Sequence, residues 1–210
     1  RLGHAMKKPN ILLLLTDQQR WDTIAAAGHS HMTTPNLDRL LQQGCHYTHA
    51  YTPNPVCMPA RHNLITGLSS RFHDYPDNNA HPLDPKIPIF PRLLAENGYD
   101  TRAIGKMHFN PVRADHGFKT LELMEELPAN REDDEYAMYL KSVGLGNIQN
   151  IQGVRNILYT QPQRSIMPNE HHGTTWVGNR SVDFIDNTAG QQPFFLFSSF
   201  IQPHPPWAVL

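Results

Sequence analysis

The sequence predicts an α/β fold in which helices flank a largely parallel central sheet. Residues 11–15 form a continuous aliphatic run with polar residues at both ends, which is typical of a strand buried on both faces. Residues 194–200 form a second, strongly apolar run. Between them, predicted strands alternate with predicted helices, which is the order expected when helices pack on a parallel sheet.

Each predicted element in the first half of the chain has its own start or stop signal. Residues 34–43 are predicted to be a helix, because the segment opens with an N-cap threonine followed by proline and is followed by glycine. Residues 45–51 are predicted to be a strand. Residues 90–96 form a predicted helix that an Asn-Gly pair stops, and residues 99–104 return as a strand.

The second half of the chain gives weaker signals. Residues 125–142 carry acidic and aromatic side chains and are predicted to form a surface helix. Residues 144–168 show no hydrophobic period, so we expect an irregular excursion there. Residues 176–185 are predicted to be a helix. The adjacent His171 and His172 would make a poor chelating pair on a helix, and we expect them at the surface.

The composition excludes several classes of protein. The chain has 210 residues, enough for one substantial core, and a formal net charge of -1, which argues against a general nucleic-acid binder. Its 2 cysteines cannot make a disulfide-rich scaffold, and its apolar runs fall short of the roughly 20 residues that cross a bilayer. The 13 histidines and 18 prolines instead indicate ordered loops and a polar site.

The N-terminus predicts where the structured part begins. Residues 1–5 precede Met6 and are typical of a vector-derived remnant, so we expect the structured part to be 6–210. Lys7 and Lys8 are followed by only five aliphatic residues, which is too short a core for a signal peptide. We therefore expect a cytoplasmic protein, or a periplasmic or secreted one if a leader has been removed.

Polar side chains follow three predicted strands at their carboxyl ends. Asp17 and Gln18 follow the first strand, Lys106 and His108 follow the strand that ends near residue 104, and His204 follows the last strand. Ligands of open α/β sheets bind beyond the carboxyl ends of the strands, so these clusters converge if the strands are neighbours. Taken singly, each residue is also explained as a turn residue, a solvated charge or a structural histidine.

The segment CMPARHNLITG, which begins at Cys57, carries the most specific pattern in the chain. A lone cysteine is most often a small buried hydrophobe. Here Pro59, Arg61, Thr66 and Gly67 all fall at set offsets from it, and the segment resembles the signature of the type I sulfatases, Cys-x-Pro-x-Arg followed by four residues and Thr-Gly. In that family the cysteine is oxidised to formylglycine, whose hydrated aldehyde is the nucleophile.

The resemblance extends along the chain through the ordered blocks 9–18, 34–40, 98–108, 116–118 and 203–206. It implies an alkaline-phosphatase/sulfatase-like layered fold. The family's catalytic domain continues well beyond this length and supplies further metal ligands there. The resemblance therefore implies that this chain is the N-terminal part of the domain, and that it is neither stable nor active without the C-terminal part.

The resemblance also assigns roles to the residues at the strand ends. Asp17 and Gln18 would be oxygen ligands of Ca²⁺, with Mg²⁺ as the alternative, and Cys57 as formylglycine would complete that side of the site. Gln18 stands where many sulfatases have a second aspartate, which removes one negative charge.

The remaining roles concern the reaction. Arg61 would hold formylglycine and the metal-site carboxylates, while Lys106 and His204 would neutralise the sulfate oxygens or help the leaving oxygen take a proton. His108 would bind the second hydroxyl of the hydrate and assist the release of sulfate. The implied activity is hydrolysis of a sulfate monoester to an alcohol and inorganic sulfate by way of a sulfated enzyme.

Alternatives to that activity stay open. The same scaffold serves phosphonate monoester and phosphodiester hydrolases, and without its C-terminal part the chain would be an inactive binding fragment. The partners implied by the resemblance are a small-molecule or saccharide sulfate ester and a formylglycine-generating maturation enzyme. No residue identifies the particular ester.

Overall fold

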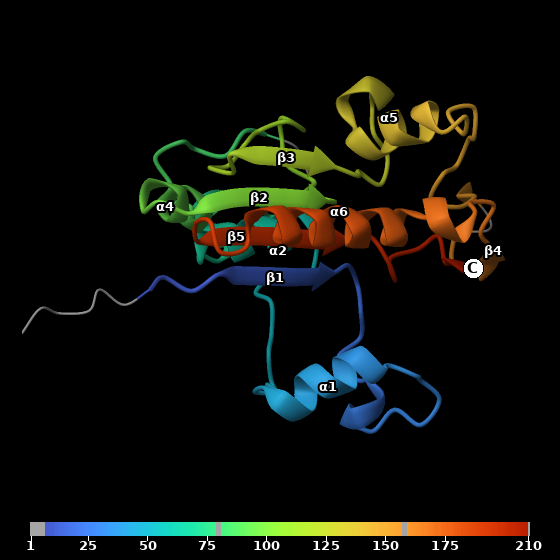
Figure 1. Cartoon of the computed structure of the whole chain (residues 1–210), viewed down its shortest axis with the longest axis horizontal. Helices are drawn as coiled ribbons and strands as arrows, with labels where there is room; N and C mark the ends of the chain where they lie inside the picture. The colour runs from blue at the N-terminus through green and yellow to red at the C-terminus, as the bar shows by residue number, and fades with distance from the viewer. Residues whose placement is uncertain (1–6, 79–80, 157–158, 210) are drawn as a thin grey trace, which may run out of the picture.

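The computed structural model describes residues 7–78, 81–156 and 159–209, so the predicted remnant at residues 1–5 lies outside the described residues. Four parallel strands form the central sheet in the order β1-β5-β2-β3 (Figure 1). They are β1 (Ile11–Thr16), β5 (Phe194–Phe200), β2 (Asp100–Gly105) and β3 (Thr120–Leu123). The predicted α/β class is confirmed, and the last long strand of the chain lies between β1 and β2.

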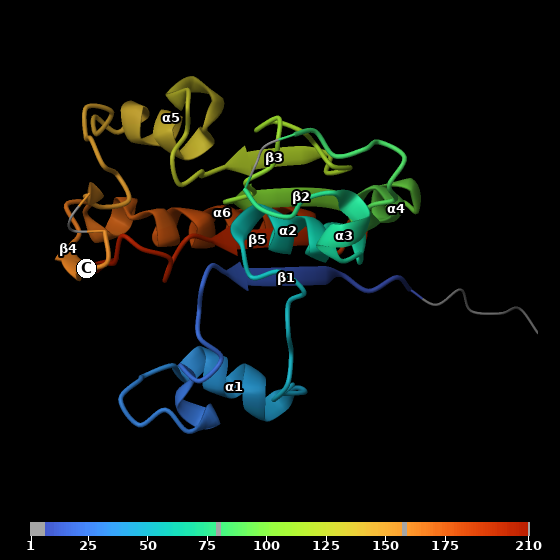
Figure 2. The same ribbon diagram turned by 180° about the vertical axis from the view of Figure 1, so that it is seen from behind.

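Helices cover both faces of this sheet. Figure 1 shows α6 in front of the strands, and the reverse view in Figure 2 shows α2 and α3 on the opposite face. The helices are α1 (Pro35–Gln43), α2 (Cys57–Thr66), α3 (Ser70–His73), α4 (Phe90–Glu96), α5 (Glu135–Ser142) and α6 (Gly173–Thr188). No helix among the described residues is both long and apolar enough to span a bilayer.

Short elements complete the fold. Single 3-10 turns occur at η1 (Ala25–Ala27), η2 (Arg131–Asp133) and η4 (Asn169–His171). The predicted irregular excursion contains one short strand, β4 (Gln163–Arg164), which pairs in parallel with β6 (Ala208–Val209) near the end of the chain.

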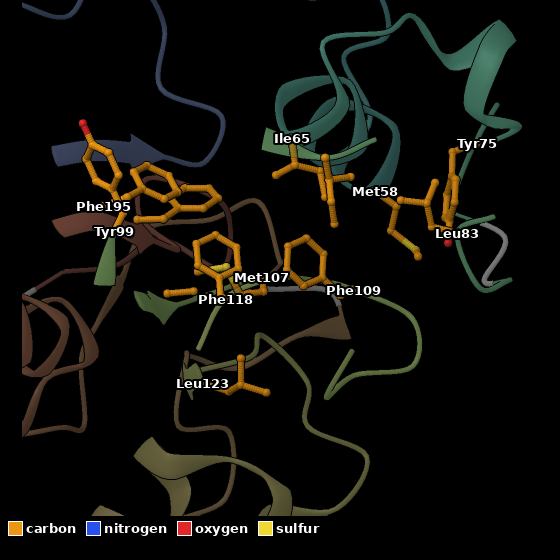
Figure 3. Close-up of a cluster of buried hydrophobic side chains, with 13 residues drawn as sticks. Met58, Ile65, Tyr75, Leu83, Tyr99, Met107, Phe109, Phe118, Leu123 and Phe195 are labelled. Carbon is orange, nitrogen blue, oxygen red and sulfur yellow. The ribbon is translucent and has the colours of Figure 1, made fainter. Parts of the chain in front are cut away.

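The two faces of β5 supply the two hydrophobic cores. Phe195 and Phe197 pack into the cluster on the α2 side, most of whose members Figure 3 labels. Phe194 and Leu196 alternate with them and pack into a second cluster with α5 and α6. Because β5 is buried on both faces, its continuous apolar sequence is explained by its central position in the sheet.

The strand predicted at residues 11–15 is confirmed as β1, but its predicted burial is wrong, and so is a second predicted strand. β1 lies at the edge of the described sheet, and Leu12 and Leu14 are 47% and 51% exposed, so this strand is not buried on both faces. Residues 45–51 form no strand. They belong to the connection between α1 and α2, where no described strand runs beside them, and a strand needs a partner to satisfy its backbone.

Two predictions in the second half also need correction. The helix expected over 125–142 spans only α5, because the Asp134 carboxylate caps it by accepting from the Ala137 amide at 2.8 Å. One side of α5 is buried, whereas Met138 and Lys141 are exposed, so it is a surface helix, as predicted. His172 is not at the surface: it is 7% exposed and serves as the N-cap of α6.

Two histidines are buried at the helix that begins at Cys57, His62 on the helix itself and His116 packed against it. His62 is 0% exposed, donates from Nδ1 to the Met58 carbonyl oxygen at 2.7 Å, and stacks on Tyr75 with ring centroids 3.8 Å apart. His116 lies edge-on to His62 at 5.7 Å. Burial lowers the pKa of each of these two histidines to about 4, so both are neutral at pH 7.

We predict that stability falls as the pH drops from 6.5 to 4. In that window the unfolded chain binds protons at His62 and His116 that the folded chain excludes, so stability rises with pH. Urea denaturation of wild type and of His116→Phe at several pH values measures this, and the variant should show the shallower pH dependence. His46→Ala, at an exposed position, is the control. If the free energy of unfolding depended equally on pH in all three proteins, the prediction would be contradicted.

Candidate active site

Asp17 lies at the carboxyl end of β1, and two cations share its carboxylate. Its amide donates to the Phe200 carbonyl oxygen at 3.1 Å, which fixes it beside the end of β5. Its Oδ2 lies 2.7 Å from Lys106 Nζ and 3.1 Å from Arg61 Nη2. Burial alone would raise the pKa of Asp17, but Lys106 and Arg61 together lower the pKa below its ordinary value. The carboxylate is therefore ionised at neutral pH.

Cys57 is the first residue of α2, and its thiol is partly exposed. The backbone amide of Met58, which has no partner within the helix, donates to Asn78 Oδ1 at 3.0 Å. At the other end, Gly67 takes a φ of 70° and donates to the Asn63 carbonyl oxygen at 2.9 Å, which closes the helix. The start of a helix favours negative charge, so residue 57 stands where an anion is stabilised.

Arg61 is one helical turn after Cys57 and connects α2 to the strand ends. It is 3% exposed. Its guanidinium donates to the Lys106 carbonyl oxygen, to Ser199 Oγ at 2.9 Å and to Asp17 at 3.1 Å. These three acceptors belong to or directly follow β2, β5 and β1, so one side chain fixes α2 against all three strands.

Lys106 follows β2 and is 0% exposed. Its ammonium contacts Glu126 Oε2 at 2.9 Å in addition to Asp17. Gly105 before it has a φ of 98°, and a Cβ there would lie 2.0 Å from the Ser199 carbonyl oxygen. Glycine is therefore required for β2 and β5 to end this close together, which is what places the lysine beside Asp17.

Glu126 joins two further side chains to this cluster. Arg155 pairs with its Oε1, and His204 Nδ1 lies 3.5 Å from the same oxygen. His204 Nδ1 also donates to the Pro205 carbonyl oxygen at 2.5 Å. Burial alone would raise the pKa of Glu126, but Lys106 and Arg155 lower it below its ordinary value. The Glu126 carboxylate is therefore ionised and holds cations on two sides.

His108 reaches the same region from the loop after β2. Its amide donates at 2.9 Å to Glu125 Oε1, which also accepts from the Met107 amide at 2.9 Å. Nδ1 of His108 is buried and has no partner among the described residues. Burial, with Lys106 and Arg61 nearby, lowers the pKa of His108 to about 4. The imidazole is neutral at pH 7 and can accept a proton.

Two adjoining cavities open at Cys57. One, of ≈ 460 Å³, is lined in part by His108 and Glu126, and the other, of ≈ 730 Å³, in part by Asp17, Gln18 and Arg61. Both are lined by Cys57, Asn78, Tyr159 and His204. The thiol is therefore reachable from a cavity large enough for a small ligand.

The structure brings together the residues that the sequence singled out. The ligand atoms of Asp17, Cys57 and His204 lie within 4.8 Å of one another, which puts the thiol at the meeting point of two strand ends. Gln18 lies on the wall of the larger cavity and is exposed. Its carbonyl oxygen can join Asp17 in holding a hard cation, because both are oxygen donors.

Four residues of this region were missed by sequence reasoning. Glu126 lies three residues after the end of β3, whereas Asp17 directly follows β1, and the four-residue strand β3 itself was not predicted. Arg155 and Tyr159 come from the irregular excursion, and Asn78 from a loop, so no periodic signal marks them.

We predict that Arg61→Met destabilises the protein strongly. The substitution removes the Arg61 donor from the Lys106 carbonyl oxygen and from Ser199 Oγ, and it leaves Asp17 paired with Lys106 but not with Arg61. Losing one partner of a buried charge pair costs about 3–5 kcal/mol. Urea denaturation measures the loss, and Arg39→Met, on the exposed face of α1, is the matched control. A loss for Arg61→Met no larger than that for the control would contradict this role.

Comparisons with known proteins agree with this geometry. The family model described as Sulfatase matches residues 9–209. The chain is 32% identical over 216 residues to an arylsulfatase of Clostridium perfringens, an alignment that covers 95% of this chain and 44% of that protein. It is 26% identical over 233 residues to the N-acetylgalactosamine-6-sulfatase of Homo sapiens, covering 96% of this chain and 41% of that protein.

A solved structure shows the same fold. The phosphonate monoester hydrolase of Agrobacterium radiobacter superposes with a TM-score of 0.74 at 24% sequence identity, covering 96% of this chain and 42% of that one. The chain thus spans less than half the length of these relatives. Because the family model covers nearly the whole chain, the chain belongs to the sulfatase family, in the alkaline-phosphatase-like superfamily.

Proposed function

We propose that the full-length protein hydrolyses a sulfate monoester to an alcohol and inorganic sulfate. One observation carries the proposal: Cys57 stands at the start of α2 with its sulfur within 4.8 Å of ligand atoms of Asp17 and His204. Water is consumed, the bond between sulfur and the ester oxygen breaks, and that oxygen leaves with a proton. Family membership supports this class of reaction.

The nucleophile in this proposal is residue 57 after oxidation to formylglycine. The modification replaces the thiol sulfur and two hydrogens with one oxygen; sulfur leaves as sulfide, and a two-electron acceptor such as molecular oxygen is reduced. The maturation enzyme must reach the Cys-x-Pro-x-Arg segment, which is helical and partly buried in the folded chain. The reaction with it therefore precedes or accompanies folding.

The donor set beside Cys57 fits a hard divalent cation. Asp17 is ionised and Gln18 lies on the same cavity wall, so the chain offers two neighbouring oxygen donors. Oxygen donors are what Ca²⁺ and Mg²⁺ prefer, and we propose Ca²⁺. Such a cation lowers the pKa of a hydroxyl at residue 57 and withdraws charge from the ester.

Basic side chains would hold the sulfate group. Lys106 contacts Glu126 Oε2 at 2.9 Å, His204 Nδ1 lies 3.5 Å from Glu126 Oε1, and a ligand atom of His204 lies within 4.8 Å of the Cys57 sulfur. We assign them to the sulfate oxygens, with His204 supplying a proton to the leaving oxygen. His108 is neutral at pH 7 and takes a proton from the second hydroxyl of residue 57. Arg61, which belongs to α2, holds the Asp17 carboxylate in position by donating a hydrogen bond to it.

A saccharide sulfate is the substrate class that we favour. The name of the human relative states that it acts on N-acetylgalactosamine 6-sulfate, and that protein aligns with 96% of this chain. The second candidate is phosphonate monoester or phosphodiester hydrolysis, which the structural likeness to the phosphonate monoester hydrolase supports. Sulfate and phosphonate groups share tetrahedral geometry, whereas the Gly-Lys-x-His arrangement at Lys106 and His108 favours sulfate.

Steady-state kinetics of the full-length protein test the function. We expect kcat/KM for 4-nitrophenyl sulfate to exceed that for 4-nitrophenyl phenylphosphonate by roughly tenfold or more, and Cys57→Ala to lower kcat by about 10⁴-fold with the fold intact. Cys45→Ala, the exposed free cysteine, is the matched control and should retain activity.

The outcomes of that experiment separate the candidates. Faster turnover of the phosphonate would replace the sulfatase proposal with the second candidate. Retained turnover in Cys57→Ala would refute the nucleophile, and no turnover of either ester by wild type would favour a binding protein.

A calorimetric titration tests the cation. We expect Ca²⁺ to bind the full-length protein and Asp17→Asn to weaken that binding by roughly tenfold or more, because the variant loses a negatively charged oxygen ligand. Asp186→Asn, at an exposed position on α6, should bind like wild type. Identical affinities for both variants would exclude Asp17 as a ligand.

A further inference from the structure

A third cavity lies beside the active site, across a ridge formed by residues 126–128. Its volume is ≈ 300 Å³, at the lower end of the range for small-molecule sites. The ridge residues also line the Cys57 cavity, so the two share a wall. The remaining lining residues come from the irregular excursion and from η2: Arg131, Gln149, Asn150, Ile151, Gln152, Gly153 and Arg155.

The charged groups of this cavity are already engaged. Arg131 donates to the carbonyl oxygens of Gly146 and Ile148, both at 2.8 Å. Arg155 pairs with Glu126, whose carboxylate also holds a lysine of the active site. These charged groups are therefore not available to a ligand that needs an unpaired charge, because each of them already has a partner.

The uncommitted groups are neutral amides. Gln149 and Asn150 are exposed, and their side chains make no hydrogen bond to another described residue. Gln152 is 5% exposed and its Nε2 is buried beside Gly173, so this donor does not open into the cavity. An amide both donates and accepts, and so does a hydroxyl group. The lining therefore suits a neutral, hydroxyl-rich ligand.

The cavity is also close to the reacting centre. Glu126 forms part of its wall and lies 2.9 Å from Lys106, which we assign to the sulfate oxygens. The carboxylate of Glu126 therefore lies between this cavity and Lys106, which we assign to the sulfate oxygens. A unit bonded to the sulfated one can cross the ridge at residues 126–128 and reach the amides.

We propose that this cavity is a subsite for the sugar unit next to the sulfated one, so that the preferred substrate is at least a disaccharide. This inference rests on the proposed sulfatase function and specifies its substrate. The exposed amides of Gln149 and Asn150 bind hydroxyl groups of the neighbouring sugar, and the gain appears as a lower KM.

Matched pairs of substrates test the subsite in the full-length protein. Galactose sulfated at O2, O3, O4 or O6 is compared with lactose that carries the same sulfate on its galactose, with 4-nitrophenyl sulfate as the reference. We expect kcat/KM to be roughly tenfold or more higher for the disaccharide of at least one pair, chiefly through KM. Gln149→Leu should reduce that advantage to about threefold or less, whereas Gln191→Leu, at an exposed amide outside the cavity, should preserve it.

Failure of the subsite and failure of the function give different results. Hydrolysis of 4-nitrophenyl sulfate without a disaccharide advantage in any pair, or an advantage that Gln149→Leu keeps in full, overturns the subsite alone. No hydrolysis of 4-nitrophenyl sulfate or of any sugar sulfate overturns the proposed function itself.

Discussion

The carboxylate of Asp17 is the group on which the arrangement of the site depends. Arg61 and Lys106 are 3% and 0% exposed, and both direct their charge at this one carboxylate. A buried cation without a partner is costly, so Arg61 depends on Asp17 for its ion pair, and Lys106 depends on Asp17 together with Glu126. Since Arg61 also holds the carbonyl of Lys106 and the hydroxyl of Ser199, the start of α2 and three strand ends form one unit.

The charge of this unit agrees with the proposed substrate. Two ionised carboxylates, Asp17 and Glu126, face three basic side chains, Arg61, Lys106 and Arg155. The net charge of these five groups is positive even without a metal ion. The groups lie in a partly enclosed region, where charge interactions are stronger than in water. An anionic ester is attracted to such a region, and the cations are already positioned for the charge that develops on its oxygens.

The sequence predicted the centre of the site better than its surroundings. Asp17, Lys106 and His204 each follow a strand, and because the parallel strands β1, β2 and β5 are neighbours, the prediction that they converge is confirmed. The structure adds a feature that was not predicted: Cys57 and Arg61 lie one turn apart on the helix α2.

Glu126 and Arg155, which surround the centre of the site, could not be predicted, and the reason is physical. Glu126 depends on a strand of four residues, too short to show a period, and Arg155 reaches it from a segment without regular structure. Their contacts are set by tertiary packing, which local sequence patterns do not encode. The strand wrongly predicted at residues 45–51 shows the converse, because a local pattern there finds no neighbouring strand with which to pair.

The identity of the side chain at position 57 is the most direct test of this account. Mass spectrometry of the proteolytic peptide that contains Cys57, from full-length protein made in a host with the maturation enzyme, measures it. The account predicts a peptide about 18 Da lighter than the thiol form, since CH2SH becomes CHO. Finding only the thiol in such a host would contradict it.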